Sequence, residues 1–101
     1  MDIDLVEKEI IGLNRRFVAI CTRTDERNLP ELSVKLNVGM PFLRSLRGLN
    51  TDQLDAIATT PRCLLQPAID ERSISHAASI KSGTTRSLFL SSTKVVRDAI
   101  A

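Results

Sequence analysis

The chain has 101 residues, of which 43% are hydrophobic and 26% charged, and its formal net charge is +2. This length and composition predict one small globular domain over residues 1–101, and the net charge alone indicates no partner. Three phenylalanines without tryptophan or tyrosine argue against single-stranded nucleic-acid binding by base stacking. No apolar run reaches the length of a membrane span and the acidic N-terminus does not resemble a secretory signal, so we expect a cytoplasmic protein.

The first predicted element is a long helix over residues 3–24. Apolar residues recur there at alternating steps of three and four, the a/d pattern of a helical seam, and they are Ile3, Val6, Ile10, Leu13, Phe17 and Ile20. Asp2 or Asp4 at the start suits the helix dipole. A second apolar line lies beside the first and consists of Ile11, Val18 and Cys21. Either one line packs on its own domain and the other on a partner chain, or both lines face inward.

Three short helices are predicted in the middle of the chain. Pro30 and Pro41 fit the first helical position, where a missing N–H is harmless, and Gly39 and Gly48 fit the position just after a helix end. The third helix opens with the capping box Asn50–Gln53. Helices this short bury their apolar faces only by packing on a longer element.

A short edge strand is predicted after Pro61, which ends the third helix because the residue before proline is disfavoured in helical conformation. Residues 62–69 form an apolar run, and Pro67 within it confines a strand to a sheet edge. A lone edge strand in a helical chain needs a partner, and the same segment of a second copy would provide one. The predicted fold is therefore all-α with one edge strand, as a homodimer.

The last third of the chain has weaker signals. Residues 70–78 predict a weak helix, and residues 79–87 a loop that carries Gly83. Residues 88–101 predict a C-terminal helix, although its first residues are equally compatible with an extended chain.

Nothing in the sequence predicts an enzyme, a metal site or a bound cofactor. His76 has no nucleophile at a recognisable spacing, and Asp52 and Asp55, three apart, are typical of a solvated helical face. Cys21 and Cys63 lie far apart without a paired-cysteine motif, so we expect buried free thiols.

A basic surface is predicted in the middle of the chain, because residues 32–51 contain no acid. This stretch holds Lys35, Arg44 and Arg47, which are our candidates for contacts with DNA phosphates. Residues 34–46 also have the outline of a helix-turn-helix. However, Lys35 stands where that motif needs a small residue, and Ser45 stands where it needs an apolar one. These departures argue against the motif, and a stand-alone helix-turn-helix regulator is therefore kept only as an alternative.

Several runs together resemble the family of the flagellar transcriptional regulator FlhD. They are GLNRRFVAICTRT, SVKLNVGM, LRGLNTDQLDAIA, LLQPAID and the tail LFLSSTKVVRD. The resemblance implies an all-α homodimer that joins a zinc-binding, FlhC-like partner in a heterohexameric activator of transcription on promoter DNA. RNA polymerase is a further candidate partner, and the zinc belongs to the partner. Related pairs serve flagellar genes or the conjugative-transfer genes of mobile elements.

The resemblance also implies particular site residues. The dimer interface would include Phe17, Ile20, Cys63 and Leu65. The family's intersubunit cysteine falls at Leu65, and because residues two apart on a strand share a face, Cys63 is the candidate for an interchain disulfide. A DNA-contacting arginine of the family falls near Lys35. The competing interpretation is a protein-interaction module or anti-activator that touches no DNA.

Overall fold

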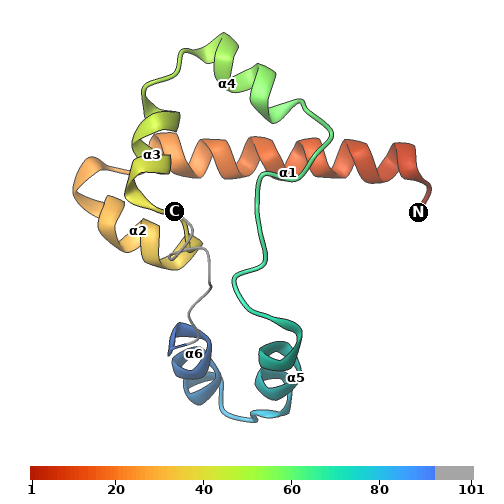
Figure 1. The fold of residues 1–101 in the computed structure, drawn as a ribbon, viewed down its shortest axis with the longest axis vertical. Helices are drawn as coiled ribbons and strands as arrows, with labels where there is room; N and C mark the ends of the chain where they lie inside the picture. The colour runs from red at the N-terminus through yellow and green to blue at the C-terminus, as the bar shows by residue number, and fades with distance from the viewer. Residues whose placement is uncertain (93–101) are drawn as a thin grey trace. The chain divides into compact units, whose positions relative to one another are not determined.

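A computed structural model describes residues 1–92 and is helical over most of them (Figure 1). The elements in order are α1 (Ile3–Arg23), the 3-10 turn η1 (Glu26–Asn28), α2 (Leu29–Leu36), α3 (Met40–Arg47), α4 (Thr51–Ala58), α5 (Glu71–Ser79) and α6 (Gly83–Ser92). The prediction of an all-α fold is confirmed. Within residues 1–92 there is no strand, and the predicted edge-strand segment, residues 62–69, is irregular in the single chain.

The chain forms two compact units, Met1–Gln66 and Pro67–Ala101. The first contains α1 to α4, and the second contains α5 and α6. The single domain over residues 1–101 stays a prediction. No helix in the described part of the chain combines the length and the apolar character needed to cross a membrane.

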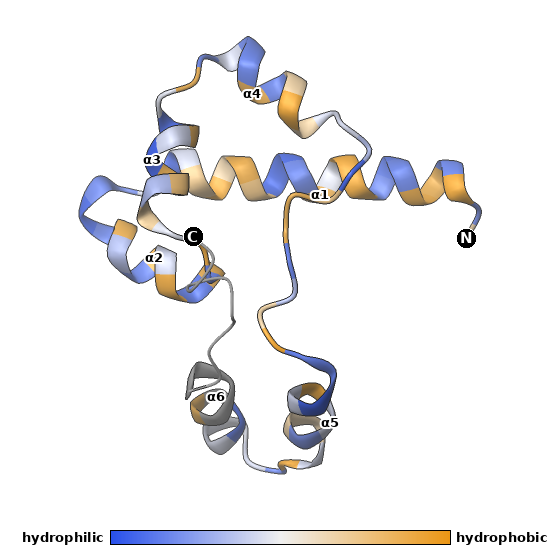
Figure 2. Cartoon of the chain, in the orientation of Figure 1, coloured by the Kyte–Doolittle hydropathy of each residue, from blue (hydrophilic) through white to orange (hydrophobic). Residues whose placement is uncertain are grey.

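Helix α1 begins and ends where its local chemistry predicts. The Oδ1 atom of Asp2 accepts a hydrogen bond of 2.9 Å from the N–H of Leu5, and the chain turns extended at Thr24. Hydrophobic and hydrophilic stretches alternate along the helix (Figure 2). The buried side of the helix takes Phe17 from the first apolar line and Val18 and Cys21 from the second, whereas Leu13 and Ile20 of the first line are exposed, so the burial does not follow either line as a whole.

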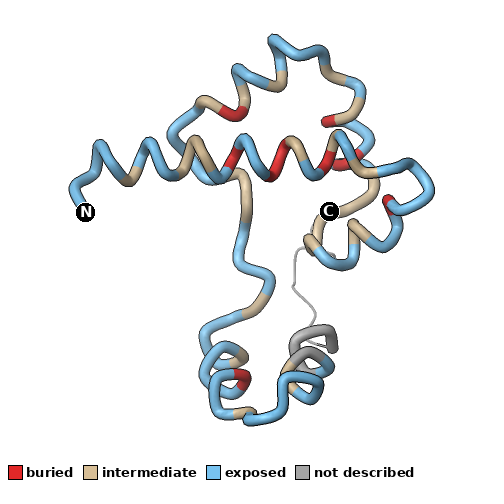
Figure 3. Tube along the Cα trace, turned by 180° about the vertical axis from the view of Figure 1, so that it is seen from behind, coloured by how far each residue is buried: buried red, intermediate tan, exposed pale blue. Residues whose placement is uncertain are grey.

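The core of the first unit forms where the short helices pack on the second half of α1 (Figure 3). Its buried members are Phe17, Cys21, Leu29, Leu43 and Leu46. Helices α3 and α4 contact α1 directly, whereas α2 contacts α3 and η1. The ring of Phe42 packs at a tilt on that of Phe17, with 6.1 Å between centroids. The expectation that the short helices pack on a longer one is confirmed for α3 and α4.

The helix caps confirm some turn predictions and correct one. Gly39 does not follow the end of a helix; instead Asn37 ends α2 in the left-handed conformation, with φ 55°, and Gly39 is the N-cap of α3. Asparagine tolerates this conformation better than most residues. Gly48 follows α3 as predicted. The capping box is confirmed, since Asn50 accepts from the Gln53 N–H at 2.8 Å and Gln53 accepts from the Asn50 N–H at 3.0 Å.

The left-handed conformation of Asn37 gives a test of the turn between α2 and α3. We expect Asn37→Ala to lower the free energy of unfolding by about 1 kcal/mol, because alanine lacks the short polar side chain that makes asparagine more tolerant of the left-handed conformation than other residues with a Cβ. Asn37→Gly should retain full stability, since glycine has no Cβ to crowd the following carbonyl oxygen. Urea denaturation of both variants measures the difference, and equal stabilities would contradict the assigned cap.

In the described part of the second unit, Arg86 on α6 binds the end of α5. Asp70 caps α5 by accepting from the Ser73 N–H at 2.7 Å, and this hydrogen bonding lowers the pKa of Asp70. The Arg86 Nε donates to the Ala77 carbonyl at 3.0 Å, and its guanidinium also donates to the Ile80 carbonyl.

The start of α6 corrects a prediction. The helix begins at Gly83, so the predicted loop over residues 79–87 is wrong in its second half. Arg86 explains the difference, because it reaches back to the last carbonyls of α5 and thereby ties the new helix to the previous one. The predicted C-terminal helix over residues 88–101 is helical to Ser92, and its remainder lies outside the described residues.

Candidate functional site

The three predicted DNA-contact residues lie at the ends of α2 and α3, and each has an acidic partner. The Lys35 Nζ is 3.9 Å from the Glu31 carboxylate, one turn earlier on α2. Arg44 donates from Nη1 to Oε1 of Glu26 at 2.8 Å, and the Arg47 Nε is 3.6 Å from Oε2 of the same side chain. Glu26 stands in η1, outside the acid-free run. The fold therefore places Glu26 beside both Arg44 and Arg47, whereas the partner of Lys35 lies on the same helix.

Arg47 differs from the other two in its surroundings. Its side chain is only 22% exposed, against 70% for Lys35 and 60% for Arg44. Its Nη1 donates at 2.8 Å to the carbonyl of Cys21, near the C-terminus of α1. Carbonyls in the last turn of a helix lack helical partners and favour a positive charge. Arg47 therefore joins the end of α3 to the end of α1.

The two cysteines occupy different environments. Cys21 is buried in the core, and burial raises the pKa of its thiol, while the positive charge of Arg47 acts in the opposite direction. Cys63 is exposed in the irregular segment. The predicted burial is thus confirmed for Cys21 and wrong for Cys63. A raised pKa keeps the Cys21 thiol neutral and poorly nucleophilic.

The predicted dimer-interface residues fall into two groups. Phe17 is 2% exposed and belongs to the core of its own chain, and Leu65 is half-buried against that core. Ile20 on α1 is 46% exposed and Cys63 is exposed. Only the second pair therefore presents substantial surface to another molecule.

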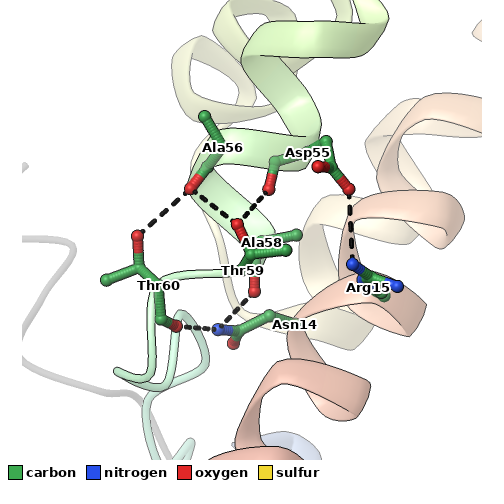
Figure 4. Close-up of polar contacts among 7 residues, drawn as sticks. All are labelled: Asn14, Arg15, Asp55, Ala56, Ala58, Thr59 and Thr60. Atoms are coloured by element: carbon green, nitrogen blue, oxygen red, sulfur yellow. Dashed lines mark hydrogen bonds and ion pairs between the residues drawn. The ribbon is translucent and has the colours of Figure 1, made fainter.

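Asn14, which sequence reasoning missed, is the polar centre of the first unit (Figure 4). It is fully buried, and its amide nitrogen donates to the carbonyls of Ala58, Thr60 and Arg62 at 3.3, 3.1 and 2.9 Å. Its Oδ1 accepts from the Leu64 N–H at 2.9 Å. One side chain thus holds the chain that leaves α4 against the middle of α1. The sequence signal that could have indicated burial of Asn14 is its position between the two apolar lines of the first helix.

The neighbouring ion pair is much weaker. Arg15 and Asp55 approach to 3.4 Å with both side chains exposed (Figure 4), and such pairs contribute little to stability. Among residues 1–92, no three histidine, cysteine or acidic side chains are grouped so that they could hold a metal ion.

Helices α2 and α3, separated by residues 37–39, have the outline of a helix-turn-helix but differ from it in detail. The two positions at which the sequence departs from that motif, Lys35 and Ser45, are both exposed rather than packed between the helices. The exposed surface of α3 includes Phe42 and Arg44. Comparisons of the chain with models of known families, with curated proteins and with solved structures find no match. The FlhD resemblance therefore stays a prediction carried by the runs quoted above.

Proposed function

We propose that this chain is the dimeric subunit of a bacterial transcription activator that binds promoter DNA together with an FlhC-like, zinc-binding partner. The observation that carries the proposal is the order of elements: a long capped helix, three short helices with the Asn50–Gln53 box, and an irregular segment ending at Asp70. The FlhD resemblance implies a long helix, a leucine–glycine turn, a capped helix and a short strand that ends in an aspartate, so the helices occur in the implied order and the strand belongs to the proposed dimer. The subunit acts in the cytoplasm, on flagellar or conjugative-transfer genes, and the zinc belongs to its partner.

The basic residues have separate roles in this proposal. Lys35 and Arg44 have exposed side chains and contact phosphates, which positions DNA without reading its sequence. Their acidic partners are exposed too, and exposed ion pairs are weak enough to exchange for a phosphate. Arg47, bound to the Cys21 carbonyl, supports the orientation of α3 instead.

The proposed dimer uses α1 and the segment that follows Pro61. Residues 62–69 would pair as an edge strand with the same segment of the second copy, because an edge strand needs a partner outside the single chain. Cys63 is exposed there, which is a condition for the proposed interchain disulfide.

Charge reversal tests the proposed phosphate contacts. The variant Lys35→Glu with Arg44→Glu, co-purified with its FlhC-like partner, should bind a mixed-sequence DNA duplex more weakly than the wild type. Because each lost phosphate contact removes about 0.9 from the slope of log K against log salt, the slope should fall by about two. Gel-shift titrations at several salt concentrations measure it.

The matched control is Lys8→Glu with Lys81→Glu, which makes the same change in net charge at exposed positions on α1 and beyond α5. Its slope should equal that of the wild type. A slope in the Lys35/Arg44 variant that matches the control would refute the assigned contacts.

One observation favours a second function, a protein-interaction module without DNA contact. Glu26 already pairs with both Arg44 and Arg47, while α1 presents an uncovered apolar face. In that case the FlhC-like partner would bind DNA alone and lose DNA when this chain is added. The activator-subunit proposal expects the reverse, with DNA binding only by the complex of both proteins.

A further inference from the structure

The outward face of α1 carries three apolar side chains that the described chain leaves uncovered. Leu5, Leu13 and Ile20 are 44%, 44% and 46% exposed. Successive residues of a helix turn by about 100°, so these three lie within about 80° of one another. Gly12 lies at the edge of the same face, and a Cβ placed there would meet no atom within 4 Å. The face thus combines apolar side chains with open space.

The same face carries one acid and one base without partners. Glu9 and Arg16 are both exposed and lie between the apolar residues around the helix. Neither side chain forms an ion pair or hydrogen bond with any residue of the described chain 1–92. The charges along α1 are also polarised, because acids are confined to its first half and residues 10–24 contain three arginines and no acid.

From this face we infer that two copies of the chain pair through α1 in antiparallel orientation, with residue n of one copy opposite residue 25 − n of the other. In this register Leu5 faces Ile20 of the second copy, Glu9 faces Arg16, and Leu13 covers Gly12. All six positions lie on the exposed face. Each pair is complementary, because two apolar side chains meet in the first, opposite charges meet in the second, and a large side chain covers a glycine in the third. Every contact occurs twice about the two-fold axis.

A second copy is the occupant because the face is complementary to itself. Parallel pairing in register would place Glu9 against Glu9 and Arg16 against Arg16, and like charges in contact repel. It would also leave Gly12 opposite Gly12, with no side chain to fill the space. The pairing deepens, and rests on, the homodimer of the proposed function, for which it specifies surface, orientation and register.

Charge exchange tests the orientation. We expect Glu9→Arg and Arg16→Glu each to raise the dimer dissociation constant about tenfold, because symmetry turns one substitution into two like-charge contacts. The double variant restores opposite charges and should dimerise like the wild type. Glu7→Arg makes the same charge change on the opposite side of α1 and should have no effect. Sedimentation equilibrium of the full chain measures these constants.

Crosslinking tests the register independently. In a Cys63→Ser background, a mixture of Leu5→Cys and Ile20→Cys chains should form a disulfide-linked dimer on oxidation, whereas either variant alone should not. Leu5 and Ile20 are 15 residues apart, so identical positions of the two copies lie about 22 Å apart, whereas a disulfide needs Cα atoms within about 7 Å.

The outcomes separate this inference from the proposed homodimer. If the Glu9 and Arg16 substitutions left the dimer dissociation constant unchanged and no mixed disulfide formed, the antiparallel pairing would be overturned and the homodimer would stand. Disulfides formed by Leu5→Cys alone would show a parallel arrangement and overturn it as well. A chain that remains monomeric at high concentration would refute both the pairing and the homodimer.

Discussion

Replacing Asn14 with leucine is expected to lower the free energy of unfolding of the first unit by about 3 kcal/mol, because four buried or half-buried backbone groups lose their partner. Leucine has a similar size, so the loss comes from hydrogen bonding rather than from a cavity. Without the amide, the carbonyls of Ala58, Thr60 and Arg62 and the N–H of Leu64 must find water or remain unpaired. Urea unfolding followed by NMR signals from α1 to α4 measures the change.

Two controls separate the roles of the Asn14 amide. Asn14→Asp keeps the acceptor for Leu64 but replaces the donors with a negative charge beside three carbonyls, so it should destabilise at least as much as leucine at neutral pH. Arg15→Ala removes only an exposed ion pair and should cost less than about 0.5 kcal/mol. If Asn14→Leu were as stable as Arg15→Ala, the buried network would have no energetic role.

The elements that the sequence predicted well depend on neighbours in sequence. The start of α1 at Asp2 and the box of Asn50 with Gln53 are formed within four residues, so the residues that specify them are adjacent in the chain. The end of α2 at Asn37 is harder to predict, because asparagine and glycine both suit the left-handed conformation and Gly39 stands only two residues later. The start of α6 depends on Arg86 meeting the end of α5, which local propensity does not indicate.

The candidate sites were less predictable because their partners come from distant parts of the chain. The acid-free run predicted a basic surface, but packing brings Glu26, which lies outside that run, to Arg44, 18 residues away. Asn14 bonds to residues 44 to 50 positions later, and nothing in the first helix indicates that the chain returns there. Phe17 was expected at a dimer interface, yet it fills its own core, since a periodic apolar line does not say which neighbour covers it.

Replacing Arg47 with alanine is expected to lower the free energy of unfolding by about 2 kcal/mol, the range for a hydrogen bond from a charged group in a shielded position. The substitution leaves the Cys21 carbonyl without its donor and frees the end of α3 from α1. Arg47→Lys should lose about half as much, because one ammonium cannot reach both the carbonyl and Glu26 as the planar guanidinium does. Urea denaturation of each variant measures these differences.

Arg44→Ala is the matched comparison, since Arg44 binds the same Glu26 from an exposed position. It should leave stability within about 0.5 kcal/mol of the wild type while reducing the salt dependence of DNA binding by the complex. Arg47→Ala should do the opposite: it lowers stability, and at temperatures where the variant stays folded it leaves the slope unchanged, because its charge faces Cys21 and Glu26 rather than a phosphate. If both substitutions reduced the slope equally without loss of stability, Arg47 would be a DNA contact after all. Equal effects would show that the difference in exposure between Arg44 and Arg47 does not divide them into a DNA contact and a structural residue.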